Sequence, residues 1–155
     1  MIKKEDILKY QELWAKGIVE IGDSKDNYSK AESLTLELLD ELYDFRDGKV
    51  QFKPTKASDQ QFRNDKKSAL SYFIGSDKTF PEDSGFAMNQ WKNIEFKNDS
   101  INIYENIAIA MGNYFFTDGS GAETKVEYTF VYINRDNSLK IILHHSSLPY
   151  NSVQT

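Results

Sequence analysis

The feature that most constrains the fold is a run near the C-terminus in which every second residue is apolar and mostly aromatic. In the segment 125–132, Val126, Tyr128, Phe130 and Tyr132 alternate with a glutamate, a threonine and a valine. Successive side chains of a strand point to opposite faces, so this period of two predicts one face of large apolar side chains. The segment therefore predicts a half-buried strand.

Helical spacing dominates the first third of the chain. Apolar residues recur at a period near 3.6 over residues 7–21, and Gly22 ends the pattern, so we expect a first helix there. A second helix is predicted over residues 29–46, where Ser29 and Glu32 can form a capping box.

The remainder of the chain changes from helical to strand patterns. A short strand over residues 50–52 precedes a third helix, which Asn64 or Asp65 can cap and Gly75 can end. Turn-forming pairs, among them Asn98-Asp99, separate the later strands. We expect these strands at residues 86–96, 101–104, 107–116, 125–132 and 139–145. Helices followed by an antiparallel meander predict an α+β domain.

Length and composition indicate one domain over residues 1–155. A chain of 155 residues with 39% hydrophobic residues can bury a single substantial core. The 24 acidic and 19 basic residues give a net charge of −5 without a basic stripe, so nucleic acid is a poor candidate partner. Cysteine is absent, which excludes disulfides and thiolate chemistry. No apolar run is long enough to predict a membrane span.

The last predicted strand ends in four consecutive polar side chains, which suggests a pocket at that end of the sheet. Under regular alternation His145 and Ser147 share one face, while His144 and Ser146 share the other. Only one of these pairs can line a given cavity. A strand end whose polar groups are solvated or bonded to nearby backbone is the ordinary alternative.

Five sequence blocks, in order over the last two-thirds of the chain, resemble the iota-class carbonic anhydrases of bacteria and algae. The blocks are FKPTKA at 52–57, ALSYF at 69–73, MGNYFF at 111–116, VEYTF at 126–130 and HHSSLPY at 144–150. That class is similar to the association domain of calcium/calmodulin-dependent kinase II, within the nuclear-transport-factor-2-like superfamily. The resemblance implies a cone in which N-terminal helices pack on a curved antiparallel sheet and enclose a cavity.

The resemblance also implies an activity, the reversible hydration of CO2 to bicarbonate in a metal-free pocket of hydroxyl and imidazole groups. The matching positions are Thr55, Tyr72, His145 and Ser147 as catalytic residues, with Ser146 and Tyr128 as substrate-binding residues. A catalytic zinc site typically uses three protein ligands, and the chain has only two histidines, adjacent in sequence. We therefore expect neither a metal nor another cofactor.

Other functions remain open at this stage. An association domain would use the same fold to build an oligomer, although the arginines of the kinase hub are replaced near Phe130 and His145. A small-molecule binder of the SnoaL-like type would bind without turnover. A serine hydrolase is disfavoured, because Ser146 lies in no G-x-S-x-G elbow. We expect a homodimer formed through the sheet face. The compartment is not determined, and a periplasmic or plastid location would require a targeting segment that has been removed.

Overall fold

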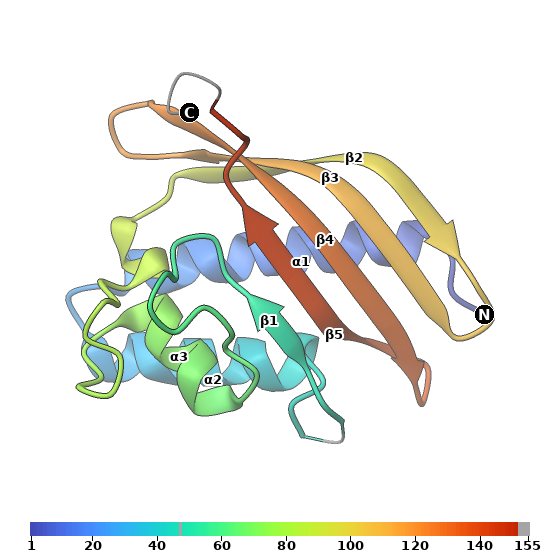
Figure 1. Cartoon of the computed structure of the whole chain (residues 1–155), viewed down its shortest axis with the longest axis horizontal. Coiled ribbons are helices and arrows are strands. Elements are labelled where there is room, and N and C mark those ends of the chain that lie inside the picture. The colour runs from blue at the N-terminus through green and yellow to red at the C-terminus, as the bar shows by residue number, and fades with distance from the viewer. Residues whose placement is uncertain (47, 152–155) are drawn as a thin grey trace.

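Helices cover one face of a five-stranded sheet in this protein (Figure 1). The computed structural model describes residues 1–46 and 48–151, so residues 152–155 of the predicted domain lie outside the described residues. In chain order the elements are α1 (Lys4–Asp23), α2 (Tyr28–Leu42), β1 (Gln51–Lys53), α3 (Lys66–Ile74), the 3-10 helix η1 (Phe86–Asn89), β2 (Asn93–Ile103), β3 (Ile107–Thr117), β4 (Glu123–Arg135) and β5 (Ser138–Ser147). This architecture confirms the predicted α+β class.

The sheet has the order β1-β5-β4-β3-β2. Strands β2 to β5 form the expected antiparallel meander, whereas the short edge strand β1 pairs with β5 in parallel, which the sequence did not indicate. Within the described residues, no helix is both long and apolar enough to cross a membrane.

The three predicted helices are present, but the start and end of α2 differ from prediction. Asn27, rather than Ser29, caps α2, because its side-chain oxygen accepts a hydrogen bond from the Lys30 amide at 3.1 Å. The helix ends at Leu42, since the extended residue Tyr43 already forms a bridge to β5. For α3, the predicted cap at Asp65 and stop at Gly75 are confirmed.

Two strand predictions for the first part of the meander are wrong. Residues 86–89 form the helix η1, not a strand, because Gly85 and Gln90 on either side take left-handed backbone conformations. The Asn98-Asp99 pair is not a turn. It lies within the continuous strand β2, where Asp99 is an additional unpaired residue in a β-bulge.

A second β-bulge lies in β5 and changes the direction of its side chains. Val131 and Tyr132 are consecutive in β4, but their partners Leu143 and Ile141 are separated by Ile142 in β5. A bulge of this kind inserts one residue into the ladder and shifts the alternation beyond it. The part of β5 after Ile142 is therefore out of phase with the part before it.

The inner face of the sheet is predominantly aromatic. The predicted apolar face of β4 is confirmed, because Val126, Tyr128, Phe130 and Tyr132 are all buried. Trp14 of α1 packs against this face, with its ring stacked on that of Tyr114 and edge-on to several neighbours. This packing fixes the long helix α1 on the sheet.

A buried ion pair joins the two loops beside α3. The Arg63 side chain is fully buried and donates to both carboxylate oxygens of Asp83, at 2.7 and 2.8 Å. Glu82 lies 3.5 Å from the same guanidinium and accepts backbone hydrogen bonds from the opposite loop, which lower its pKa to about 2. The loop after β1 is thereby held against the loop after α3.

Because removal of one partner leaves a buried charge uncompensated, we expect Arg63→Met to lower the free energy of unfolding by about 3–5 kcal/mol. Lys66→Met is the matched control, since Lys66 pairs with Asp40 at 2.7 Å in a partly exposed bridge. That variant should cost less than about 1 kcal/mol. Urea denaturation measures both, and equal losses would contradict the structural role assigned to Arg63.

Candidate functional site

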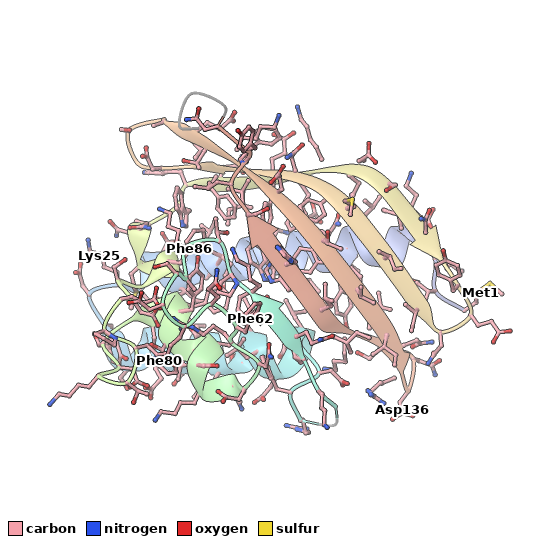
Figure 2. The ribbon with its side chains drawn as sticks, in the orientation of Figure 1. Met1, Lys25, Phe62, Phe80, Phe86 and Asp136 are labelled. Atoms are coloured by element: carbon pink, nitrogen blue, oxygen red, sulfur yellow. The ribbon has the colours of Figure 1, made fainter. Side chains whose placement is uncertain are left out.

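A small cavity lies at the end of the sheet where β5 finishes. Its volume is about 10 Å³, close to the minimum that holds one water. The lining residues are Trp14, Phe52, Pro54, Thr55, Tyr72, Phe73, Phe86, Tyr114, His144 and Ser146. In Figure 2 Phe86, one of these lining residues, lies far from Asp136 at the tip of the β4–β5 hairpin.

Larger hollows exist on the surface. One, about 630 Å³, is a groove between α1 and β2 that is lined by charged side chains of both elements. Another, about 480 Å³, is lined by Tyr128, His145 and Ser147 together with Glu127. Both are open to solvent, and His145 is exposed. We therefore take the small cavity as the candidate site, because several buried polar groups meet there.

His144 forms the inner wall of the cavity. Its imidazole is stacked between the rings of Phe52 and Phe130, with centroid distances of 4.8 and 4.0 Å. Its Nδ1 lies 2.8 Å from the Tyr43 hydroxyl and its Nε2 lies 3.0 Å from the Tyr114 hydroxyl. Burial, with a smaller contribution from neighbouring His145, lowers the His144 pKa well below its usual value, so the ring is neutral.

Three further hydroxyl groups extend this network to the cavity. Ser146 Oγ lies 2.5 Å from Tyr114 Oη and 2.6 Å from Thr55 Oγ1. Tyr72 Oη accepts a hydrogen bond from the Lys56 amide at 3.2 Å, which leaves its own proton free to donate. Burial raises the pKa of Tyr72, although that amide and the Thr55 hydroxyl act in the opposite direction, so the phenol stays protonated.

The structure brings together only part of the set that the sequence predicted. Thr55, Tyr72 and Ser146 line one cavity. The expected placement of His145 and Ser147 in the same cavity is wrong, because both side chains lie on the outer face of the sheet. His145 is exposed, and Ser147 Oγ donates to Glu127 at 2.8 Å.

The physical reason is the bulge at Ile142. Before the bulge Ile141 faces the core, and regular alternation would give the same face to residues 143, 145 and 147. The additional residue shifts the phase, so His144 and Ser146 are buried instead, at 2% and 1% exposure. A bulge next to a site that redirects side chains is a recurring structural device.

Tyr128 is also placed away from the cavity. Its ring is buried beside Tyr114, but its hydroxyl donates to Asn98 Oδ1 at 2.6 Å, and it is not among the lining residues. Asn98 is held in turn by Gln11 of α1. The predicted contact of Tyr128 with substrate is therefore not supported by its position.

Sequence reasoning gave no role to Tyr114 and placed His144 on the wrong face. Tyr114 stands in one of the family-like blocks and pairs in register with Val126, whose inward direction the alternation had already predicted. His144 pairs with Phe130, another residue predicted to point inward. The register of β5 on β4 would have identified His144, but the sequence contains no signal that fixes this register.

Among residues 1–46 and 48–151, no three side chains of histidine, aspartate or glutamate come together as a group that could hold a metal ion. The imidazoles of His144 and His145 point to opposite faces of β5, so they cannot bind the same metal ion. The polar groups that do converge are neutral hydroxyls and one neutral imidazole, which can donate hydrogen bonds to an oxygen-rich molecule of a few atoms.

Comparison with known proteins identifies the family. The model of the metal-independent carbonic anhydrase family matches residues 5–148. A metal-independent carbonic anhydrase from Nostoc sp. (strain PCC 7120 / SAG 25.82 / UTEX 2576) is 42% identical over an alignment of 153 positions that covers 96% of this chain and 75% of that protein. This chain belongs to the metal-independent carbonic anhydrase family.

Solved structures agree with this assignment. The iota-carbonic anhydrase from a cyanobacterium, crystallised with bicarbonate, superimposes on this chain with a TM-score of 0.93 at 40% identity. The superposition covers 97% of this chain and 94% of the cyanobacterial chain. A protein from Xanthomonas campestris assigned to the calcium/calmodulin-dependent protein kinase II association domain has a TM-score of 0.64 at 18% identity, with 96% and 89% coverage. An NTF-2-like protein from Shewanella oneidensis has a TM-score of 0.59 at 15% identity, with 94% and 99% coverage. The predicted nuclear-transport-factor-2-like fold is thus confirmed for this carbonic anhydrase family member.

The lowered pKa of His144 predicts how stability depends on pH. Below about pH 6.5 the unfolded chain binds a proton at His144 that the folded chain does not bind, so the free energy of unfolding falls as the pH decreases. The slope for one proton is about 1.4 kcal/mol per pH unit. Urea denaturation between pH 7.5 and 5.5 should show this loss in the wild type and in His145→Gln. In His144→Gln the slope should be shallower, and an identical slope would refute the prediction.

Proposed function

We propose that this chain catalyses the reversible hydration of CO2 to bicarbonate in the cavity formed by Thr55, Tyr72, Ser146 and His144. Membership of the metal-independent carbonic anhydrase family supports the reaction. The observation that carries the assignment of the site is the convergence of hydroxyl groups on one buried point, with Ser146 Oγ 2.6 Å from Thr55 Oγ1.

The reaction requires stabilisation of negative charge. The oxygen of water forms a bond to the carbon of CO2, one C=O electron pair moves to oxygen, and a proton is released. The phenol of Tyr72 and the hydroxyl of Thr55 are suited to donate hydrogen bonds to the oxygens on which this charge develops. Such preorganised donors act strongly in a cavity from which bulk water is excluded.

The walls of the cavity suit a small, weakly polar substrate. Phe52, Phe73 and Phe86 supply aromatic surface beside the hydroxyl groups. The volume of about 10 Å³ is close to the minimum for one water, so the cavity must widen to admit CO2 and is far too small for the larger ligands of a SnoaL-like binder. The kinase association domain resembled by this chain has an arginine near the position of Phe130. Here Phe130 stacks on His144, so no arginine at this position can bind a carboxylate ligand.

Removal of one hydroxyl at the site should impair turnover more than folding. We expect Thr55→Ala and Tyr72→Phe each to lower kcat for CO2 hydration by about 100- to 1000-fold, the usual effect of losing a donor at developing charge. Ser146→Ala should lower kcat as well, because Thr55 then loses the hydroxyl partner 2.6 Å away that orients it. Stopped-flow hydration assays measure kcat, and circular dichroism monitors folding.

Ser147→Ala and His145→Gln are the matched controls, because they change the same residue types on the opposite face of β5. Both should retain near wild-type turnover. Normal hydration by the folded Thr55, Tyr72 and Ser146 variants would exclude the proposed site. Losses confined to the Ser147 and His145 variants would restore the assignment made from the sequence.

We also propose that the chain forms a homodimer through the outer face of the sheet. Ile109, Val131 and Leu143 are paired in register across β3, β4 and β5, and all three side chains are partly exposed on this face. Met111, 51% exposed, extends the row. A contiguous apolar strip of this kind is favourable to bury against a second copy of the chain.

Light scattering at micromolar concentration should give the mass of a dimer. Val131→Lys places a charge in the middle of the strip and should shift the protein to monomer. Leu8→Lys, at an exposed position of α1, should leave the dimer intact. A monomeric wild type would contradict the proposed interface.

A further inference from the structure

The Tyr43 hydroxyl occupies an unusual position between two nitrogen atoms. It lies 3.0 Å from Trp14 Nε1 and 2.8 Å from His144 Nδ1. Within the part of the chain that the structure describes, these are its two hydrogen-bond partners. An indole N–H can donate but cannot accept. The proton of Tyr43 therefore has one available acceptor, His144 Nδ1.

This constraint determines the tautomer of His144. A neutral imidazole carries one proton, and Nδ1 must be unprotonated to accept from Tyr43. The proton is then on Nε2, which donates to Tyr114 Oη at 3.0 Å. The opposite tautomer would make the Tyr43 oxygen accept two hydrogen bonds and leave its own proton without a partner at 1% exposure. A buried, unpaired O–H group is strongly disfavoured.

The same constraint orients the hydroxyl groups that follow. Tyr114 accepts from His144 and so donates to Ser146, 2.5 Å away. Ser146 in turn donates to Thr55 Oγ1 at 2.6 Å. Each donor from Trp14 through Tyr43, His144 and Tyr114 to Ser146 then has an acceptor, and the Thr55 proton is directed to the cavity and its lining.

The inner end of this chain of hydrogen bonds is closed. It ends at Trp14, which is 2% exposed and has no site that accepts a proton. A proton taken up from the cavity would reach His144 only by reversing every hydroxyl, and it could not continue to solvent by that route.

We infer that His144 acts as a positioning residue, held by Tyr43 as the Nε2–H tautomer, and that it does not accept the proton released when CO2 is hydrated. This inference rests on the proposed function of the cavity. His144 fixes the direction of the hydroxyl groups, and the released proton passes to bulk water or buffer on the side of Thr55, the one lining residue that is partly exposed.

Nitrogen-15 NMR of histidine-labelled protein tests the tautomer directly. His145→Gln assigns the two rings. Between pH 6 and 8 we expect one proton on His144 Nε2 and none on Nδ1. A proton on Nδ1, or a charged ring, would overturn the inference. The measurement does not depend on turnover, so it remains decisive even if the wild type fails to hydrate CO2, a result that would remove the proposed function instead.

The role of Tyr43 is tested in the same spectra. Tyr43→Phe removes the donor to Nδ1, and the resonance of that nitrogen should move toward the value of an imidazole nitrogen without a hydrogen bond. Tyr10→Phe is the control, because the Tyr10 hydroxyl bonds Ser138, outside this chain of hydrogen bonds, at 3.0 Å. An unmoved Nδ1 resonance in Tyr43→Phe would show that Tyr43 does not donate to His144.

Kinetics distinguish positioning from proton acceptance. In His144→Gln the amide oxygen can accept from Tyr43 and the amide N–H can donate to Tyr114, but the group does not take up a proton near neutral pH. We expect folded His144→Gln to keep kcat within about tenfold of the wild type and His144→Leu to lose about 100-fold or more. Equal losses of about 100- to 10,000-fold in both folded variants would indicate that His144 is the proton acceptor.

Discussion

The stacking of His144 between Phe52 and Phe130 is the interaction on which the rest of the site depends. It places a polar ring in the aromatic core, where burial keeps it neutral and both nitrogens need partners. Those partners come from different elements, since Tyr43 follows α2 and Tyr114 belongs to β3. One buried imidazole thus connects the helical layer, the sheet and the hydroxyl groups of the cavity.

The bulge at Ile142 turns His144 toward the core and so makes this stacking possible. Without the additional residue, β5 would direct His145 and Ser147 inward and turn His144 and Ser146 outward. The bulge leaves one residue of the ladder unpaired, and the sheet continues on both sides of it. The edge strand β1 then pairs beside the shifted segment, so that Phe52 comes into register with His144.

Nuclear-transport-factor-2-like relatives below 20% identity share the fold, but the fold alone does not specify the chemistry. In this chain the specificity comes from a few side chains on that scaffold. Thr55 stands just after β1 and Tyr72 stands near the end of α3, and the Arg63–Asp83 pair joins the loops that follow these two elements.

The sequence by itself determined the three helices, the last three strands of the meander and the inward face of β4, because hydrophobic periodicity and capping residues are local signals. It also determined the family, and with it Thr55 and Tyr72 as candidates. Only the tertiary structure decided that His144 and Ser146, rather than His145 and Ser147, face the cavity. Strand register and the position of a bulge depend on packing against neighbouring strands, and a run of alternating residues contains no information about an inserted one.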